Sequence, residues 1–207
     1  MKQKLYPLLI ALAALAISAS AAAQTSYKLW VAGTQVTSAN AKDITAAIGN
    51  PAIATGTITY NAATQTLTLN NAKITTSRNR GIECEIPTTI RLEGTSTVTV
   101  TGVYSGITFT RPGIITGPGS LDVTSSDQIA VFHRGTSLII RDCNLTASGL
   151  WGIGGNSGYA SETLAIENAS VKAFGREASL DGVNSLTLTG CAINSPASAA
   201  FDASKKA

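Results

Sequence analysis

The chain has 207 residues, with 15 Lys and Arg residues against 12 Asp and Glu residues. Because only 13% of the residues are charged and the net charge is +3, the composition gives no electrostatic basis for binding nucleic acid or an anionic membrane surface. The length fits a single domain.

The first residues have the layout of a secretory signal peptide. Lys2 and Lys4 precede the apolar run Leu8–Ile17, and the small residues Ser18–Ala23 then provide a cleavage site at their end. The apolar run is too short for a membrane span, and no later stretch is apolar enough for one. We therefore predict a signal peptide over 1–23 and a mature protein that is secreted, periplasmic or attached to the cell surface. Its balance is 13 basic minus 12 acidic residues, or +1.

The segment after the signal differs from the rest of the chain. Residues 27–36 alternate apolar and polar side chains and predict a β-hairpin that turns near Gly33. Thr37 or Ser38 is placed to cap a short helix that runs through Ile48.

Six later segments repeat one pattern of strand, turn residue and strand. In each, two apolar residues flank a variable residue, and a turn residue precedes a second apolar strand. The segments begin at Leu67, Ile90, Ile114, Leu138, Leu164 and Leu186, and their turn residues are Asn71, Gly94, Pro118, Asp142, Asn168 and Gly190. Successive starts are 23, 24, 24, 26 and 22 residues apart, and Thr116 is the one polar residue at an expected apolar position.

A third short strand recurs later in the repeats. It is marked by Gly81-Ile82, Gly106-Ile107, Ile129-Ala130-Val131 and Gly152-Ile153, and Ser179-Leu180 matches this pattern less closely. Three short strands per repeat predict a three-sided coil, and such coils bury their apolar faces only by stacking. The predicted fold class is all-β: a single-stranded right-handed parallel β-helix of about six coils of 22–26 residues over 61–207, with the hairpin and short helix as a cap over 24–60.

The three cysteines match no zinc or redox spacing, and their odd number leaves at least one unpaired. In the expected register, Cys143 and Cys191 share a column of small residues with Ala72 and Thr95. Two coils separate the two cysteines by roughly 10 Å, which exceeds the Cα–Cα reach of a disulfide, about 7 Å. We therefore predict that they are small buried side chains, and that Cys84 is similar.

The chain resembles secreted bacterial β-helix proteins of the Bacteroidetes type that are labelled carbohydrate-binding domain-containing proteins. The resemblance covers nearly the whole mature chain and rests on Leu29–Asn40 (LWVAGTQVTSAN), Tyr60–Asn70 (YNAATQTLTLN), Leu186–Cys191 (LTLTGC) and Ala200–Asp202 (AFD). These are scaffold motifs, so no site residue is carried over. The resemblance implies a polysaccharide ligand and, through distant relatives, a calcium ion. Apart from this resemblance, we predict no cofactor.

The longest repeat spacing contains a glycine-rich loop, Gly152–Gly158, which must bulge outward from the coil. Trp151 precedes this loop, and Tyr104 lies in the corresponding region two coils earlier. Flat aromatic side chains on a rigid scaffold stack on sugar rings. The candidate ligand-binding residues are Trp151, Tyr159, Tyr104, Asn156 and Glu162. Alternatively, Trp151 packs over the base of the loop and Tyr159 pins it.

Catalysis on glycans has requirements that the sequence does not meet in an obvious way. Glycoside hydrolysis needs converging carboxylates, and β-elimination needs acidic calcium ligands with a base. The acidic residues are scattered; Glu93, Arg141 and Glu167 are expected to share one outward column as surface ion pairs. The single histidine, His133, lacks the partners of a catalytic triad and is expected in a surface loop. We assign no catalytic residue.

Three functions remain open at this point. The first is a non-catalytic binding module for a cell-surface or dietary polysaccharide. The second is a structural or adhesin-like interaction protein that associates end to end through an open C-terminal end. The third is a polysaccharide lyase or hydrolase.

Overall fold

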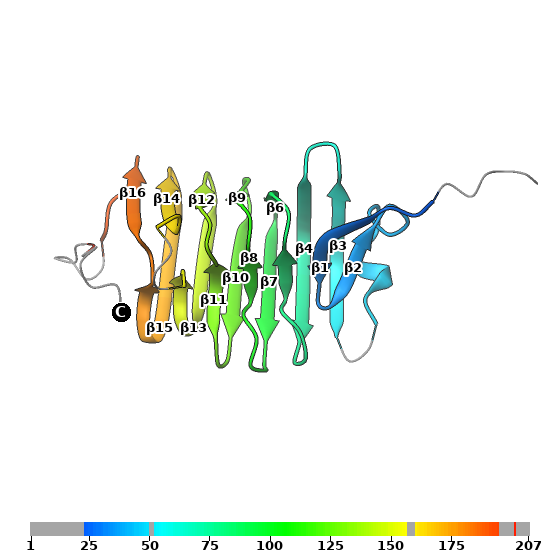
Figure 1. Ribbon diagram of the computed structural model, residues 1–207, viewed down its shortest axis with the longest axis horizontal. Coiled ribbons are helices and arrows are strands. Elements are labelled where there is room, and N and C mark those ends of the chain that lie inside the picture. Colours follow the sequence, from blue (N-terminus) through cyan, green and yellow to red (C-terminus); the bar gives the residue numbers. More distant parts are fainter. Residues whose placement is uncertain (1–22, 50–51, 157–159, 195–200, 202–207) are drawn as a thin grey trace, which may run out of the picture.

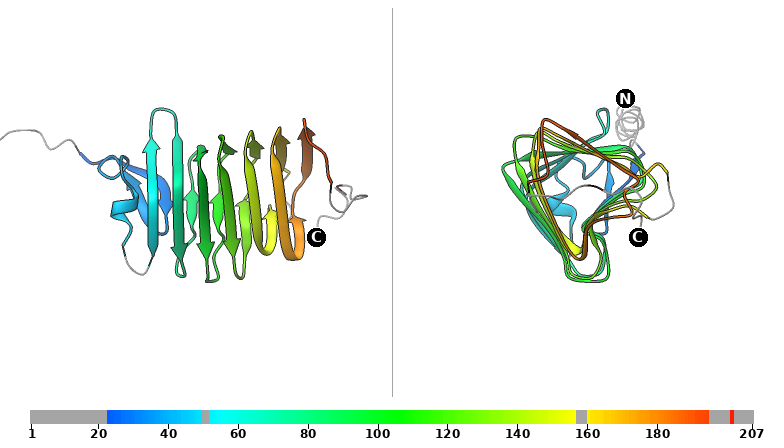
Figure 2. Two further views of the ribbon diagram at one scale, coloured as in Figure 1. Left: turned by 180° about the vertical axis from the view of Figure 1, so that it is seen from behind. Right: turned by 90° about the vertical axis from the view of Figure 1, so that its left-hand side faces the viewer.

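The computed structural model describes residues 23–49, 52–156, 160–194 and 201, and within them the chain forms sixteen β-strands and one short 3-10 helix. Figure 1 shows the strands side by side along one long axis, and the end view in Figure 2 shows successive coils superimposed as a triangle. Each side of the triangle is a parallel sheet. Because β4, β13 and β15 bend from one side to the next, hydrogen bonding continues from sheet to sheet.

The three sheets take one strand, or part of one, from each coil. The first contains Thr66–Asn70 of β4 (Thr66–Thr76), β6 (Thr88–Glu93), β9 (Gly113–Thr116), β12 (Leu138–Arg141), β14 (Thr163–Glu167) and β16 (Ser185–Thr189). The second contains the end of β4, β7 (Thr95–Val100), β10 (Ser120–Ser125) and the first parts of β13 (Asn144–Gly154) and β15 (Ser170–Asp181). The third contains β5 (Ile82–Cys84), β8 (Ile107–Phe109), β11 (Ile129–His133) and the later parts of β13 and β15.

Columns of apolar side chains, one residue per coil, fill the interior. The column of the first sheet is Leu67, Ile90, Ile115, Ile140, Ile166 and Leu188. The columns of the second and third sheets are Ile74, Val98, Val123, Ala147 and Ala173, and Ile82, Ile107, Val131, Ile153 and Leu180. Each fully buried Leu, Ile or Val contributes about 1.5–3 kcal/mol through the hydrophobic effect, so stacking supplies the stability that one coil lacks.

The predicted fold class is confirmed, with about five turns rather than six. The second sheet has five strands, and the sixth repeat adds only β16 to the first sheet. Among the described residues, the sixth repeat therefore contributes an edge strand to the first sheet.

The register of the third repeat differs from the predicted one. Ile115, rather than Ile114, lies in the interior column, and Ile114 and Thr116 alternate with it on the outer side. A slip of one residue exchanges the two faces of a strand, so this shift places Thr116 toward solvent. Thr116 is therefore not a polar residue in the interior column. Gly113 occupies the position that Leu138 fills in the next coil.

The predicted turn residues form the corner between the first and second sheets. Backbone φ is positive at Asn71 (48°), Gly94 (66°), Asp142 (52°), Asn168 (47°) and Gly190 (65°). Asparagine, aspartate and glycine tolerate this left-handed conformation, so Asp142 is confirmed as a turn former. In the third repeat the left-handed residue is Gly117 (φ 117°) and not Pro118, because the proline ring holds φ near −65°.

The small residue that begins each third-sheet strand packs against the inner face of the second sheet. A Cβ atom on Gly81 would lie 2.2 Å from Cγ1 of Val98, and one on Gly106 would lie 2.3 Å from Cγ1 of Val123. The predicted Gly-Ile pairs are confirmed as one column, and the first position holds only Gly, Ala130 or Ser179 because the corner leaves little room for a side chain.

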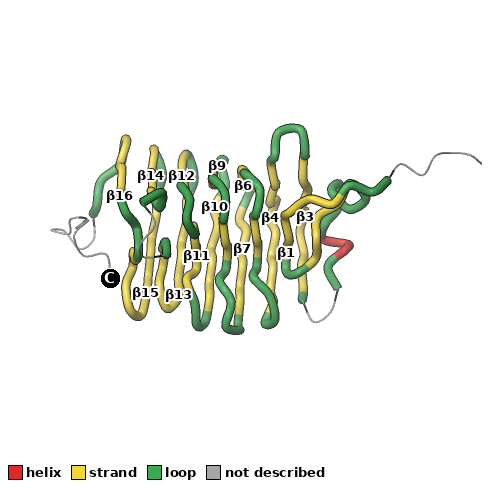
Figure 3. Tube along the Cα trace, viewed as in Figure 1, coloured by secondary structure: helices red, strands yellow, loops and turns green. Residues whose placement is uncertain are grey.

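The N-terminal cap contains the predicted hairpin and less helix than expected. Strands β1 (Ser26–Val31) and β2 (Thr34–Thr37) pair antiparallel around Gly33, and β3 (Ile53–Asn61) pairs antiparallel with β4. The helix is a single 3-10 turn, η1 (Thr45–Ala47), drawn red in Figure 3, and not a helix from Thr37 or Ser38 to Ile48. Asn40 caps the turn after β2 instead, since its side chain accepts a hydrogen bond from Thr37 N at 2.8 Å. In the part of the chain that is described, no helix has the length and apolarity to span a membrane.

All three cysteines are free, as predicted, and Cys84 and Cys143 are buried. Burial raises the pKa of Cys84 to about 12 and that of Cys143 to about 11, so both thiols stay protonated. The predicted column is wrong in its early members: Ala72 aligns with Leu145, while Cys143 aligns with Gly119 and Ala169. The first-sheet strands of the later coils pair two residues further along than predicted, so that Leu67 is in register with Ile140 and not with Leu138.

Candidate functional site

The outer face of the third sheet carries a column of alternating large and small residues. In register from coil to coil it contains Glu83, Thr108, Phe132, Gly154 and Asp181. Phe132 is half-buried, and its two neighbours in the column are small. Gly154 lies between Phe132 and Asp181 and brings no side chain, so the space above its Cα is filled from adjacent columns.

Trp151 belongs to the next outward column of the same face. It pairs with Ile129 in the preceding coil and with Ala178 in the following one. A Cβ on Gly154 would lie 3.4 Å from Cδ1 of Ile129, which shows that this column leans over Gly154. The adjacent Gly152 instead faces the interior, where a Cβ would lie 3.0 Å from Cβ of Ala173. Trp151 therefore projects outward, and it is half-buried. We name Ile129, Phe132, Trp151, Gly154 and Asp181 the Trp151 surface.

Tyr104 lies on the corner between the second and third sheets, in the loop between β7 and β8. Its side chain is 37% exposed, and its carbonyl oxygen accepts a hydrogen bond from Oγ of Ser125 at 2.8 Å. The strand that follows Tyr104 is two coils from the Gly152-Ile153 strand of Trp151. At about 4.8 Å per coil, the two aromatic residues are separated by about 10 Å along the solenoid axis. Tyr104 thus lies two coils before Trp151, and the residue in the column of Trp151 is the neighbouring Ser105.

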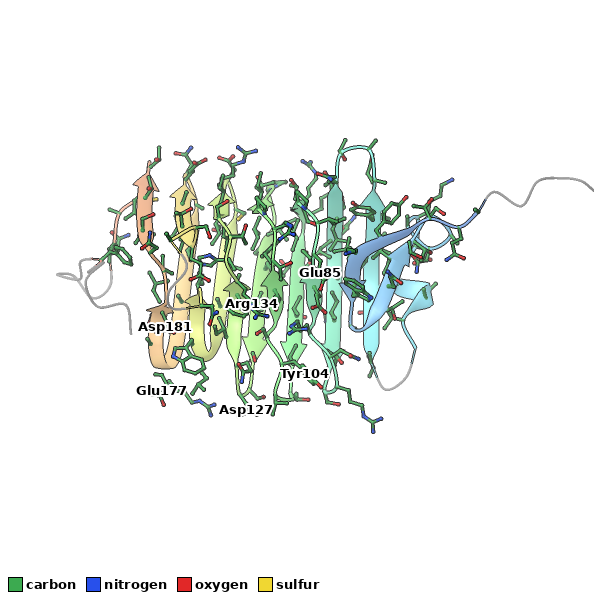
Figure 4. The ribbon with its side chains drawn as sticks, viewed as in Figure 1. Glu85, Tyr104, Asp127, Arg134, Glu177 and Asp181 are labelled. Carbon is green, nitrogen blue, oxygen red and sulfur yellow. The ribbon has the colours of Figure 1, made fainter. Side chains whose placement is uncertain are left out.

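Charged groups surround the two aromatic residues. Arg176 donates a hydrogen bond to the carbonyl oxygen of Ser126 at 2.6 Å, and its guanidinium lies 3.5 Å from Oδ1 of Asp127. Figure 4 shows Glu177, Asp127 and Tyr104 in one row along the corner, with Asp181 and Arg134 above them on the third sheet. Burial raises the pKa of Asp181, and a backbone hydrogen bond from Gly182 opposes this shift. The aromatic residues thus have both hydrogen-bond donors and acceptors beside them.

Glu162 does not lie on this surface, contrary to our prediction that it contacts a ligand. Its side chain is 0% exposed, and its Oε1 atom accepts hydrogen bonds from the backbone nitrogens of Gly135 (2.7 Å) and Asn156 (2.6 Å). The carboxylate occupies the space left by Gly155, whose Cβ would lie 2.8 Å from Oε2. Glu162 therefore ties the two ends of the loop to the preceding coil. Asn156 is exposed at the start of the loop, and Tyr159 lies outside the described residues.

We predicted that His133 lies in a surface loop, and this prediction is wrong. His133 is buried inside the solenoid. It follows Phe109 in an inward column, and its Nδ1 atom donates a hydrogen bond to the carbonyl oxygen of Thr136 at 2.9 Å. Its Nε2 atom and Oε2 of Glu162 are both buried without a hydrogen-bond partner among the described residues. The prediction failed because a histidine beside an arginine suggests an exposed polar segment, whereas the register places the imidazole inside and Arg134 outside.

Acidification is expected to destabilise the protein through His133. Burial lowers the pKa of His133 below its ordinary value of 6.5, while the hydrogen bond to Thr136 and the charge of Glu162 oppose this shift. The unfolded chain then binds more protons than the folded chain, so the free energy of unfolding falls as the pH drops below about 6.5. Denaturant titrations of wild type and His133→Asn at pH 7.5 and 5.5 measure this. The variant should lose less stability on acidification; equal losses would contradict the assignment.

The expected outward column of Glu93, Arg141 and Glu167 is only partly present. Arg141 and Glu167 are neighbours in register, but no ion pair joins them among the described residues, and Glu93 lies two residues further along its strand than the partner of Arg141. Glu93 pairs instead with Arg91, at 3.2 Å. Both partners are substantially exposed, so this pair contributes little to stability.

The described side chains that could ligate a metal ion or transfer a proton are few and scattered. Within the described ranges, no three His, Cys, Asp or Glu side chains are grouped as a metal site requires. Among the described residues, the buried acid–base pair is His133 and Glu162, and both side chains are 0% exposed. The Trp151 surface is therefore the arrangement best suited to contact a large external ligand.

No family model, no curated protein and no solved structure matches this chain. The functional assignment therefore depends on the geometry of the third sheet.

Proposed function

We propose that this protein is a secreted, non-catalytic carbohydrate-binding solenoid that recognises a cell-surface or dietary polysaccharide through Trp151 and Tyr104. The observation that carries the proposal is that two partly exposed aromatic side chains lie near one edge of a rigid sheet, two coils or about 10 Å apart along the solenoid axis. This separation suits a disaccharide unit of a polymer that runs parallel to the solenoid axis. A polymer in this direction crosses successive coils, so the sugar repeat of the polymer and the coil repeat of the protein follow the same axis.

The surroundings of the two aromatic residues supply the polar part of such a site. Asp127, Arg176 and Asp181 offer carboxylate acceptors and guanidinium donors, the groups that hydrogen-bond to sugar hydroxyls. Apolar ring faces stack on indole and phenol rings while these groups fix orientation. The parallel sheet holds the aromatic residues in place before binding, which reduces the entropy lost on association.

Substitution of Trp151 by alanine is expected to weaken glycan binding about tenfold or more, since a central aromatic anchor typically contributes 2 kcal/mol or more. Tyr104→Ala should weaken it less, because the tyrosine lies at the end of the row. A glycan array on the chain from Gln24 onward identifies the ligand, and isothermal titration then compares the variants. Phe174→Ala is the matched control, because Phe174 is 57% exposed but lies on the outer face of the second sheet.

Binding that persists unchanged in the Trp151→Ala, Tyr104→Ala double variant would contradict the proposed site. Equal losses in Phe174→Ala would show that the effect is not local. The same glycans, incubated with the protein with and without added calcium, test the alternative lyase or hydrolase activity through release of shorter products. Release of such products would contradict a purely binding function.

A further inference from the structure

A second tryptophan lies on the outer face of the third sheet, in the N-terminal cap. Strand β1 pairs antiparallel with β5, and this pairing places Trp30 opposite Glu83. Leu29 and Val31, on either side of Trp30, are completely buried, so Trp30 points outward, where it is half-buried. The chain has two tryptophans, and both Trp30 and Trp151 therefore lie on the outside of this one sheet. Tryptophan is usually well buried unless it serves a contact surface, so this placement indicates such a surface.

Trp30 begins an outward column that also contains Phe132. In register from strand to strand the column contains Trp30, Glu83, Thr108 and Phe132. Three strand spacings separate Trp30 from Phe132, which is about 14 Å along the solenoid axis. Thr108 points outward between them but is only 2% exposed, so larger neighbouring side chains cover it and the face is level here. We name Trp30 and Phe132 the Trp30 row.

The Trp30 row runs beside the pair formed by Tyr104 and Trp151. Ile129, the strand neighbour of Trp151, precedes Phe132 by three residues on β11. At about 3.3 Å per residue, the row and the pair are up to about 10 Å apart across the sheet. Both follow the direction of the solenoid axis. One sugar chain is too narrow to stack on both, whereas sugar chains that pack side by side can contact both.

The charged side chains of this face alternate in sign. Nη1 of Arg80 lies 2.8 Å from Oε1 of Glu83. Figure 4 shows Glu85 and Asp181 toward the two ends of the face, with Arg134 between them. Among the described residues, no strip of one sign therefore runs along the sheet, and attraction of an anionic polymer requires a basic strip. The charges thus favour a neutral polysaccharide.

We propose that the third sheet binds the surface of an insoluble neutral polysaccharide, whose parallel chains lie over both the Trp30 row and the pair of Tyr104 and Trp151. This inference rests on the proposed function, and it adds Trp30 and Phe132 to the binding residues. Contact with several chains strengthens binding, because once one chain is bound the next chain meets its own aromatic residues at a high effective concentration.

The chain from Gln24 onward should bind washed particles of cellulose, β-chitin, mannan or β-1,3-glucan more tightly than the soluble hexasaccharide of the same sugar. Trp30→Ala should weaken binding to the particles about tenfold and leave binding to the hexasaccharide unchanged, because a single chain occupies Tyr104 and Trp151. Trp151→Ala should weaken both. Depletion of protein from the supernatant measures particle binding, and isothermal titration measures hexasaccharide binding. Phe174→Ala is the matched control, because it removes an exposed aromatic ring from the second sheet.

Oxidation of the two tryptophans in the wild-type protein is a second test, which needs no variant. N-bromosuccinimide oxidises accessible indole rings, and mass spectrometry of the peptides distinguishes Trp30 from Trp151. The particles should protect both residues, whereas the hexasaccharide should protect Trp151 alone. Binding to the particles should also persist in about 1 M sodium chloride, which screens ionic contacts.

Particle binding that Trp30→Ala leaves unchanged, or weakens no more than it weakens hexasaccharide binding, would overturn the inference. Particles that leave Trp30 open to oxidation would overturn it as well, and loss of particle binding at high salt would overturn the assignment to a neutral polysaccharide. Binding to a soluble hexasaccharide but to none of the particles would overturn this inference and leave the proposed function standing. Binding that Trp151→Ala does not weaken contradicts the proposed function itself, so the two failures are distinguishable.

Discussion

Phe109→Ala is expected to lower the free energy of unfolding by about 3–5 kcal/mol, the typical cost of removing a buried aromatic side chain. Phe109 is among the largest side chains with no exposed surface, and it lies in register between Cys84 and His133 in the interior of the third sheet. Its ring also fills the space left by Gly113, where a Cβ would lie 2.5 Å from Cδ1 of the phenylalanine.

Guanidinium titration followed by circular dichroism measures this loss. The control is Phe174→Ala, which removes the same atoms from a side chain that is 57% exposed and should cost less than about 1 kcal/mol. Similar losses in the two variants would contradict the inward position of Phe109. The unfolding curves should also be compared by fluorescence, since solenoids can lose their coils in separate steps.

Glu162→Ala is expected to cost about 3 kcal/mol and to loosen the corner between the third and first sheets. The substitution leaves the backbone nitrogens of Gly135 and Asn156 without their acceptor, and hydrogen bonds to a charged group typically contribute about 1.5–3 kcal/mol each. Amide hydrogen exchange should accelerate at both positions. The amide of Gly155 bonds to the carbonyl oxygen of Asp181 at 2.9 Å and should remain protected.

Two variants separate the role of the hydrogen bonds from that of the charge. Glu162→Gln keeps an acceptor oxygen with nearly the same shape, so it should lose less stability than Glu162→Ala. Glu177→Ala removes an exposed carboxylate from a different corner of the solenoid and should change stability by less than about 0.5 kcal/mol. Unchanged exchange at Gly135 and Asn156 in Glu162→Ala would contradict the anchoring role of this residue.

The candidate site was predictable where it depends on the repeat and unpredictable where it depends on a loop. The repeat places Trp151 and Tyr104 near one edge two coils apart, because each shortly precedes a Gly-Ile pair, but Trp151 is one residue and Tyr104 two residues before its pair. Glu162 and His133 do not follow from it. A glutamate and a histidine near a glycine-rich loop suggest an exposed polar site, and only the path of the chain shows that both point inward.

The amino-acid sequence by itself determined the coil, its three strands and the left-handed corners, because the same pattern of apolar residues and turn residues recurs about every two dozen residues. It did not determine the register of each coil. Corners that differ by one or two residues shift a strand, and each single shift exchanges its inner and outer faces, as at Ile114 and Ile115. Only the tertiary structure, in which neighbouring coils must hydrogen-bond and share one interior, decided which side chains are buried and that Glu162 is an anchor.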